Sequence, residues 1–547
     1  MNGTSLASTG AHSSQHGVVA QPVLIAGRWR EAKAVDTFVA HNPRTGEVLP
    51  ERYPVSGWAD LDEALASAWK AAIELRATPD APERIGGFLD AYAALLEANA
   101  DELARVAALE TGLAATPRLQ TIELPRTVGQ LRQAAAAARE GSWLRPTIDT
   151  KTNIRSCLAP IGPVWVIGPN NFPFAFNGVA GGDFAAAIAA GNPVLAKGHP
   201  SHPKTSQLLA EAAHEAVVKA KLPVGAVQMI YRTRSDDGLK LIADARLRAV
   251  GFTGSRSAGL RMKAAADVAG KPFFGEMSSV NPLVVLAGAL VDHADAIVDQ
   301  LTTSVLAGTG QFCTKPGLVL VPAGPSGEAF IEKVRQKMSA APVTPLLSAG
   351  SRDSLLKSIE TLRTAGARVA CGGSAADAPG FCVANTLLTC TGEQFLQNPH
   401  GLQTEAFGNA TLVVLVRDRA QLLAIVEALE GNLTGTVYSS ASGADDADYA
   451  AVEPALRRRV GRLLNDKMPT GVAVCAAMNH GGPFPATSQA HFTAVGLPAA
   501  IWRFTQLESY DNVRPDRLPA CLRNVNPTGR MWRLIDGQWT QGDVTSA

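Results

Sequence analysis

Residues 164–173 read Val164-Trp165-Val166-Ile167-Gly168-Pro169-Asn170-Asn171-Phe172-Pro173, a short apolar run followed by a turn rich in glycine, proline and asparagine. Four consecutive apolar residues that end in such a turn are typical of a strand buried on both faces. Similar runs recur along the chain with helical patterns between them. This alternation predicts an α/β protein with parallel sheets, which bind ligands at the carboxyl ends of their strands.

The apolar runs form two sets, which predicts two α/β domains. The first set continues with strands at 193–196, 226–230, 249–252 and 271–275, and helices at 202–220 and 257–267. The second set has strands at 283–286, 317–322, 411–416 and 436–438, and helices at 294–306, 327–339 and 422–430. Ahead of both sets, the apolar spacing predicts helices from residue 60 onwards and at 85–98, 101–109 and 119–139.

The composition excludes several classes of protein. The chain has 547 residues, 46% hydrophobic and 18% charged, with a formal net charge of +1, which argues against nucleic acid or an anionic membrane as a partner. No segment has eighteen uninterrupted apolar residues. Residues 1–21 are rich in Ser, Gly, Thr and His and lack a signal-peptide pattern, so we expect a disordered leader and a cytoplasmic protein.

Seven cysteines are scattered along the chain with no Cys-x-x-Cys pair, so we expect neither a disulfide framework nor a metal site. One of them lies in Gly308-Thr309-Gly310-Gln311-Phe312-Cys313-Thr314-Lys315-Pro316-Gly317, just before an apolar run. A thiol on a turn beside a buried strand can be both fixed and reachable, which covalent catalysis requires. Inert packing is the commoner role of a lone cysteine and stays open here.

Three further motifs follow predicted strands, and each has an ordinary structural alternative. The asparagines of 168–173 offer N–H donors for an oxyanion, or form a plain turn. The Gly/Ser turn of 252–259 precedes a helix and suits a pyrophosphate, although it lacks the G-x-G-x-x-G pattern and an ordinary turn is the alternative. Glu276, among apolar residues of 274–282, suits a general base, or pairs with a surface lysine.

A thiol, an amide donor, an isolated carboxylate and a dinucleotide turn together make a complete set for oxidising an aldehyde through a thioester. The ten histidines are scattered, and the sequence reveals no pairing between any of them and Cys313.

From about residue 22 to residue 539 the chain resembles the aldehyde dehydrogenase superfamily. The matching motifs are Leu109–Gly112, Asn171–Pro173, Ala190–Pro193 with Lys197, Gly251–Ser255, Glu276 with Asn281-Pro282, Gly310–Cys313 and Glu405–Gly408. The chain looks most like the subgroup that holds 2,5-dioxovalerate (α-ketoglutaric semialdehyde) and NADP-dependent fatty aldehyde dehydrogenases. That closer likeness is carried by residues 181–183, 197–203, 310–317 and 479–487.

The resemblance implies a role for each catalytic residue. Cys313 would attack the aldehyde carbon, and Asn171 with the backbone N–H of Cys313 would hold the oxyanion. Hydride would pass to the nicotinamide, and Glu276 would activate the water that hydrolyses the thioester.

The resemblance also implies the cofactor site. Lys197 would bind the adenosine ribose, and Pro200 stands where NAD-preferring relatives place a glutamate, which favours NADP over NAD. The other expected cofactor contacts are Pro169, Gly254 and Ser255 near the pyrophosphate, Glu405 and Phe407 at the nicotinamide, and Ser201 and Arg234, with Arg232 and Lys204, near a 2′-phosphate.

The family architecture implies a Rossmann-type cofactor domain (22–149 and 164–283), an α/β catalytic domain (284–490) and a β oligomerisation arm with a tail (150–163 and 491–547). The arm strand near Ile154 and the tail would pair across subunits in a homodimer or homotetramer.

The resemblance implies a small aldehyde as the substrate, with α-ketoglutaric semialdehyde and a long-chain or aromatic aldehyde as alternatives. Five phenylalanines line an apolar tunnel or pack ordinarily: Phe172, Phe174, Phe312, Phe484 and Phe492. A CoA-acylating enzyme and a non-catalytic relative are the remaining alternatives, and both fit poorly with the presence of Glu276.

Overall fold

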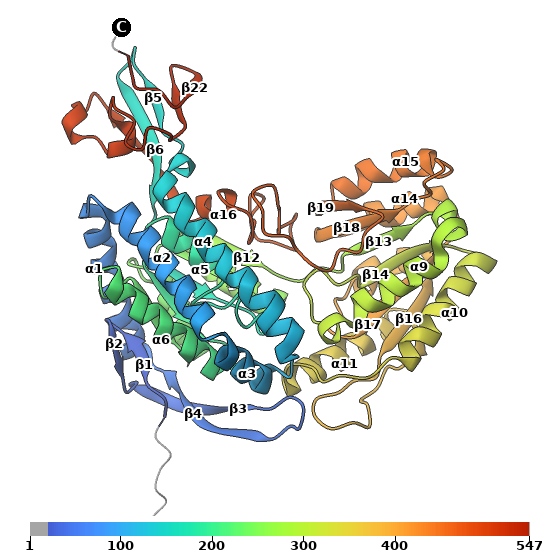
Figure 1. Cartoon of the computed structure of the whole chain (residues 1–547). Coiled ribbons are helices and arrows are strands. Elements are labelled where there is room, and N and C mark those ends of the chain that lie inside the picture. The colour runs from blue at the N-terminus through green and yellow to red at the C-terminus, as the bar shows by residue number, and fades with distance from the viewer. Residues whose placement is uncertain (1–19, 546–547) are drawn as a thin grey trace, which may run out of the picture.

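The computed structural model describes residues 20–545 and consists of two α/β lobes with a small β arm that projects from the first lobe (Figure 1). Residues 1–19 of the predicted leader lie outside the described residues. In the described part of the chain, no helix combines the length and apolar character needed to cross a membrane.

The first lobe is built on a seven-stranded sheet in the order β12-β11-β7-β8-β9-β1-β2. Strands β12 to β9 of this order are parallel, and β1 joins the edge antiparallel to β9. The strands are β1 (Val23–Ile25), β2 (Arg28–Arg30), β7 (Val164–Ile167), β8 (Val194–Lys197), β9 (Val227–Ile230), β11 (Ala249–Thr253) and β12 (Phe273–Glu276). A side sheet holds β10 (Arg232–Thr233), β4 (Val48–Ser56) and β3 (Ala34–His41).

Helices cover both faces of this sheet, so its central strands are buried along their whole length. The α-helices of the lobe are α1 (Trp58–Ala77), α2 (Ala81–Ala98), α3 (Ala100–Thr111), α4 (Leu124–Glu140), α5 (Gly182–Ala189), α6 (Pro203–Lys219), α7 (Ser235–Ala243) and α8 (Arg256–Val268). The short segments η1 (Ala115–Glu123, a π-helix) and η2 (Ser142–Leu144) complete it. The predicted α/β class and the positions of the strands are confirmed.

One predicted helix, at 119–139, is divided in the structure. Residues 115–123 form the wide π-helical segment η1, and α4 starts at Leu124 with Pro125 in its first turn. Proline has no N–H to donate to the preceding turn, so the regular α-helical hydrogen bonds cannot run through this point. The break turns Arg118 and Glu123 into the molecule, where both side chains are largely or fully buried.

The second lobe has its own seven-stranded sheet, in the order β15-β16-β17-β14-β13-β18-β19, which is parallel except for β15. Its strands are β13 (Pro282–Val285), β14 (Leu318–Pro322), β15 (Arg368–Cys371), β16 (Thr386–Thr391), β17 (Ala410–Val416), β18 (Asn432–Tyr438) and β19 (Val460–Asn465). Its helices are α9 (Ala287–Leu306), η3 (Ala307–Gly310), α10 (Pro325–Ala340), α11 (Ala349–Thr364), α12 (Gly392–Gln397), α13 (Pro399–Leu402), α14 (Arg419–Glu427) and α15 (Asp446–Arg457). The second sheet therefore begins at Pro282, before the predicted boundary at 284.

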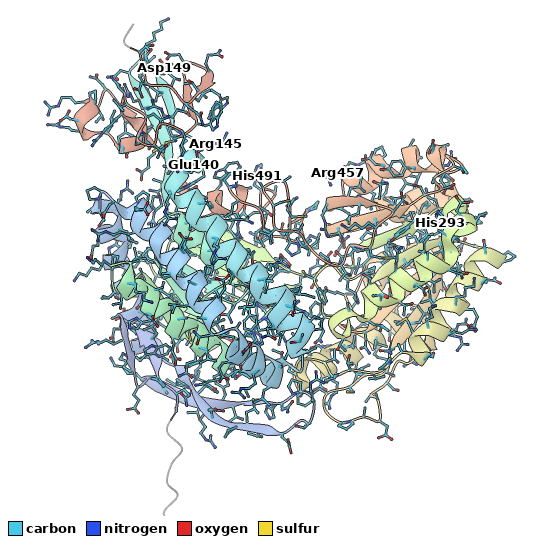
Figure 2. All side chains as sticks on the ribbon, in the orientation of Figure 1. Glu140, Arg145, Asp149, His293, Arg457 and His491 are labelled. Atoms are coloured by element: carbon cyan, nitrogen blue, oxygen red, sulfur yellow. The ribbon has the colours of Figure 1, made fainter. Side chains whose placement is uncertain are left out.

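The arm is a five-stranded sheet in the order β20-β6-β5-β21-β22. Its elements are β5 (Thr147–Asp149), β6 (Ile154–Pro160), β20 (Thr505–Asp511), β21 (Arg533–Ile535) and β22 (Gln538–Thr540), with α16 (Ala499–Trp502), η4 (Pro515–Arg517) and η5 (Ala520–Leu522) nearby. Figure 2 marks the path of the chain into the arm from Glu140 through Arg145 to Asp149. β6 lies between β20 and β5 of the same chain, so the expectation that this strand itself pairs across subunits is corrected. Pairing of the tail across subunits stays a prediction.

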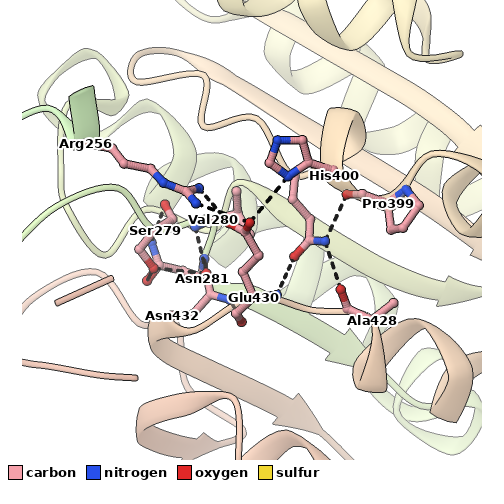
Figure 3. A network of polar contacts seen from close by, with 10 residues as sticks. Arg256, Ser279, Val280, Asn281, Pro399, His400, Ala428, Glu430 and Asn432 are labelled. Carbon is pink, nitrogen blue, oxygen red and sulfur yellow. Dashed lines mark hydrogen bonds and ion pairs between the residues drawn. The ribbon is translucent and has the colours of Figure 1, made fainter. Parts of the chain in front are cut away.

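The two lobes are connected by the segment between β12 and β13 and by residues 466–498, between β19 and α16, and an ion pair spans them. Arg256 at the start of α8 pairs with Glu430 of the second lobe at 2.7 Å (Figure 3). In the same network Asn432 accepts hydrogen bonds from the backbone N–H groups of Val280 and Asn281, at 2.8 and 3.1 Å. These bonds fix the connection that follows Glu276, and so fix Glu276 relative to the second lobe.

Candidate active site

Cys313 lies on a loop of the second lobe that faces the carboxyl ends of the first sheet. Gly308, Thr309 and Gly310 precede it, and all three have positive φ angles of 55–67°. At Gly310 a side chain is excluded by space as well, because its Cβ would lie 2.1 Å from the carbonyl oxygen of Gly408. This tightly wound turn holds the thiol partly buried between the lobes.

Two cavities meet at the thiol. One, of about 410 Å³, lies along the carboxyl ends of β7, β11 and β12 and past α11. The other, of about 440 Å³, extends past Arg118, Arg126 and Val472. Cys313, Phe172 and Phe176 line both cavities, so the sulfur borders both.

A histidine that the sequence did not connect with Cys313 contacts its sulfur. The Nε2 atom of His480 lies 3.3 Å from Cys313 Sγ, and 3.3 Å from Oε2 of Glu276. The backbone N–H of His480 donates to Oγ1 of Thr493 at 2.9 Å, which fixes the part of the chain that carries the imidazole. The one available signal was the segment 479–487, which carries part of the family resemblance and contains this histidine.

The thiol is protonated by preference in this environment. Burial raises the pKa of Cys313 well above its usual range, and the neighbouring charge of Glu276 raises it further. Arg126 acts in the opposite direction. A group that accepts the thiol proton is therefore needed before the sulfur can act as a nucleophile, and the imidazole of His480 is within reach to do so.

Asn171 follows β7 and points its amide toward the Cys313 loop. Its Nδ2 donates to the carbonyl of Gln311 at 2.8 Å, which leaves the second N–H of the amide free of that bond. Arg118 donates to the backbone carbonyl of Asn171 at 3.2 Å and holds the loop in place. Cys313, Asn171 and Glu276, three residues far apart in sequence, thus line one cavity.

Five of the eight predicted cofactor residues line this first cavity with them: Pro169, Gly254, Ser255, Glu405 and Phe407. Gly254 and Ser255 form the turn into α8, and Ser255 caps that helix without a side-chain hydrogen bond. The first turn of a helix has backbone N–H groups without intrahelical partners, which suits a pyrophosphate. Burial raises the pKa of Glu405, which lies against the buried Lys315.

The other three predicted residues lie outside the lining of that cavity. Lys197 ends β8, and burial lowers its pKa to about 8. Ser201 follows it on the next loop, where its backbone N–H donates to Nδ1 of His199 at 3.2 Å. Arg234 is exposed and donates to the carbonyl of Val35 at 3.3 Å.

Buried side chains support the loop between Lys197 and α6. Glu110 accepts hydrogen bonds from the backbone N–H groups of Lys204 and Thr205, both at 2.8 Å, and burial raises its pKa to about 7. His202 contacts the carbonyl of Pro169 at 3.3 Å, and burial lowers its pKa to about 4. The motif residue Glu110 therefore positions the loop after β8.

Metal-ligating side chains come together at one place in residues 20–545. Atoms of Glu276, Cys313 and His480 lie within 4.8 Å of one another. Carboxylate, thiolate and imidazole are ligands that zinc accepts. The same three groups form the reactive cluster described above, and no metal is needed to account for their arrangement.

A model of the aldehyde dehydrogenase family matches residues 29–451. The chain is 38% identical over 530 residues to alpha-ketoglutaric semialdehyde dehydrogenase 2 of Azospirillum brasilense. This match covers 94% of this chain and 98% of that protein. It is 35% identical over 502 residues to alpha-ketoglutaric semialdehyde dehydrogenase of Acinetobacter baylyi, with coverages of 88% and 92%.

Solved structures share the fold. The NAD⁺ complex of an aldehyde dehydrogenase from Bacillus cereus has a TM-score of 0.75 at 20% identity and covers 90% of this chain and 96% of that one. Aldehyde dehydrogenase C of Pseudomonas syringae, in a complex with NAD⁺ and octanal, has a TM-score of 0.76 at 20% identity, with coverages of 91% and 98%. The match to the family model over most of the chain, and the two relatives above 30% identity, show that the chain belongs to the aldehyde dehydrogenase family.

Proposed function

We propose that the protein oxidises α-ketoglutaric semialdehyde to 2-oxoglutarate with NAD(P)⁺ through a thioester on Cys313. The observation that carries the reaction is the contact of Cys313 Sγ with His480, beside Glu276, at the point where two cavities meet. The two α-ketoglutaric semialdehyde dehydrogenases that match the chain over most of its length support the substrate.

In the first half of the reaction the sulfur attacks the aldehyde carbon. His480 Nε2, in its unprotonated form, accepts the thiol proton across 3.3 Å. The amide of Asn171 and the backbone N–H of Cys313 donate to the oxygen that becomes negative. Bound NAD(P)⁺ supplies the acceptor for the hydride that leaves the aldehyde carbon, and a thioester remains on Cys313.

In the second half, water hydrolyses the thioester. The carboxylate of Glu276 accepts a proton from the water, which then attacks the thioester carbon. Glu276 is fully buried at the end of β12, so few water molecules compete for its oxygens. His480 lies 3.3 Å from Glu276 and can return a proton to the departing sulfur.

The first cavity fits the nicotinamide cofactor. The free first turn of α8 suits the pyrophosphate, while Glu405 and Phe407 line the cavity beside Cys313 where the nicotinamide ribose and ring would lie. We infer a preference for NADP, because Pro200 follows Lys197 where a glutamate would repel a 2′-phosphate. Lys197, Ser201 and Arg234 would serve the adenosine end.

A long-chain or aromatic aldehyde is the second candidate, and the apolar lining of the second cavity favours it. Phe172, Phe312 and Val472 line that cavity. Of the other phenylalanines predicted for a tunnel, Phe174 is fully buried, Phe484 is largely exposed and Phe492 packs beside Phe176, and none of them lines the cavity.

The test is the formation of reduced cofactor with a panel of aldehydes in the absence of CoA. We expect NADP reduction with α-ketoglutaric semialdehyde to exceed that with aliphatic and aromatic aldehydes. A higher kcat/KM for a long-chain or aromatic aldehyde would favour the second candidate, and strict dependence on CoA would overturn the hydrolytic mechanism. Cys313→Ala should abolish turnover and retain cofactor binding.

We also infer that the arm mediates assembly into a homodimer or homotetramer. Large apolar side chains are exposed on or near its strands, among them Leu507, Trp532 and Trp539. Several large apolar side chains exposed on one small sheet are typical of a protein interface. Light scattering on the wild type and on Leu507→Glu tests this role, and a monomeric wild type would contradict it.

A further inference from the structure

The second cavity contains a positive charge that has no counter-ion in the part of the chain that the structure describes. Arg126, in the first turn of α4, lines this cavity together with Cys313. Its Nε and Nη2 atoms are buried and have no hydrogen-bond partner in the described residues. Within residues 20–545 it also forms no ion pair, although a buried guanidinium stays charged and is costly to leave unpaired.

The neighbouring arginine has a counter-ion, although its Nε is also buried without a hydrogen-bond partner among the described residues. Arg118 also lines the cavity, but it pairs with Glu123 and donates to the carbonyl of Asn171 at 3.2 Å. The second oxygen of Glu123 is occupied as well, since it accepts the backbone N–H groups of Phe174 and Ala175 at 2.8 and 3.0 Å. Glu123, the carboxylate that lines this cavity beside Arg126, therefore already has partners for both oxygens. The cavity wall keeps an excess positive charge.

Aromatic rings flank the free guanidinium. Its central carbon lies 5.6 Å from the ring centre of Phe172 and 5.2 Å from that of Phe176. Cation–π contacts compensate part of the lost hydration, yet they offer no acceptor to the N–H groups. The rings do restrict the guanidinium, which prepares it to bind a planar anion.

We propose that Arg126 binds the carboxylate of the substrate while the aldehyde at the other end of the same molecule reaches Cys313. This inference rests on the proposed aldehyde oxidation and names the class of substrate, a short aldehyde that carries a carboxylate. A guanidinium fork matches a carboxylate with two parallel N–H···O bonds. Val472 and Ile122 on the cavity wall suit the methylene groups between the two ends.

The apolar lining of the second cavity strengthens the effect of this charge on a substrate. Most of the wall of this cavity of about 440 Å³ is apolar, so an anion that enters it loses much of its water and gains from a fixed positive group. A neutral aldehyde gains nothing from Arg126 and leaves it unpaired. The cavity therefore selects for charge, although most of its lining is apolar.

The test compares two aldehydes of the same chain length, 5-oxopentanoate and pentanal, together with α-ketoglutaric semialdehyde. In Arg126→Met we expect the ratio of kcat/KM for 5-oxopentanoate over that for pentanal to fall about 100-fold, mainly through KM. Both rates come from the same preparation, so the ratio is independent of the folded fraction. Arg126→Lys, which keeps the charge without the fork, should recover part of the ratio.

A matched control lies on the same helix. Arg132 of α4 is exposed and pairs with Glu97 outside the cavity, so Arg132→Met should leave the ratio unchanged. A second readout needs no turnover: calorimetry should detect binding of 2-oxoglutarate to Cys313→Ala, and a loss of at least 30-fold in affinity when Arg126→Met is added.

The outcomes separate the two proposals. If the wild type oxidises α-ketoglutaric semialdehyde and Arg126→Met keeps the ratio, the role of Arg126 is wrong and the proposed function stands. If the wild type prefers a different carboxylate-bearing aldehyde and Arg126→Met loses that preference, Arg126 is confirmed and the proposed substrate is wrong. An unchanged ratio in a wild type that prefers pentanal overturns both.

Discussion

The Nε2 atom of His480 lies 3.3 Å from the sulfur of Cys313, although 167 positions separate the two residues in the sequence. The same atom lies 3.3 Å from the carboxylate of Glu276. The imidazole therefore stands between a thiol that must lose a proton and a carboxylate that must later accept one. This position gives His480 a part in both halves of the proposed reaction.

Replacing this imidazole should slow the formation of the thioester. We expect His480→Gln to lower the pre-steady-state rate of reduced cofactor formation by about 10²–10⁴, because the thiol loses its proton acceptor. Stopped-flow absorbance measures this step directly. His491→Gln is the matched control, since His491 is exposed and lies on the same segment between β19 and α16 as His480 (Figure 2). Equal loss in both variants would contradict the assignment.

The reactivity of the thiol should depend steeply on pH. The raised pKa of Cys313 means that the thiolate fraction in the cofactor-free protein is small near neutral pH. Below that pKa the thiolate fraction rises about tenfold with each pH unit. The rate of alkylation by iodoacetamide should therefore increase from pH 6 to pH 9 without a plateau. A plateau below pH 8 would show that the thiol is already ionised.

Replacement of Glu276 should separate the two halves of the reaction. Glu276→Gln removes the negative charge that raises the pKa of Cys313, so alkylation at pH 7 should become faster. Hydrolysis of the thioester should slow by about 10²–10⁴ for lack of a base. A burst of one equivalent of reduced cofactor followed by near-arrest is expected. Steady turnover without a burst would exclude Glu276 as the base.

Asn432 should contribute to stability through the connection between the lobes. Its side-chain oxygen accepts the backbone N–H groups of Val280 and Asn281 and a hydrogen bond from Ser279 Oγ (Figure 3). Asn432→Ala leaves these buried donors unsatisfied, which should lower the free energy of unfolding by about 2–4 kcal/mol in urea denaturation.

The exposed Asn99 provides the control for that measurement, because its side chain bonds only to the carbonyl of Leu95 within the helix end. Asn99→Ala should change the unfolding free energy by less than about 1 kcal/mol. A similar decrease in the unfolding free energy of both variants would show that the Asn432 network does not stabilise the protein more than an exposed hydrogen bond does. Turnover of Asn432→Ala should also fall, since the network fixes the segment after Glu276.

Coenzyme choice should respond to residue 200. Pro200→Glu places a carboxylate three residues after Lys197, where it would repel a 2′-phosphate and accept hydrogen bonds from ribose hydroxyls. We expect kcat/KM for NADP to fall at least 10-fold while that for NAD stays equal or rises. Initial rates with both cofactors decide this, and an unchanged NADP rate would place the phosphate elsewhere.

Local pattern predicted most of the fold because the signals were local. The apolar runs at 164–167 and 318–321 are buried strands, β7 and most of β14, as their uninterrupted hydrophobicity indicates. Helix α11 gave a weak signal because only three of its residues, Leu355, Ile359 and Leu362, are buried. The π-helical segment at 115–123 escaped prediction, because the apolar spacing from residue 119 onwards continues into α4 and indicates one helix.

The sequence by itself determined the α/β class, the positions of the central strands, and the motifs that contain Cys313, Asn171 and Glu276. Only the tertiary structure decided that His480 contacts the sulfur and that Glu123 pairs with Arg118. It also decided that Arg126 has no ion-pair partner among residues 20–545. The physical reason is that a strand or turn depends on neighbours in the chain, whereas a proton acceptor or a counter-ion is defined by distance in space.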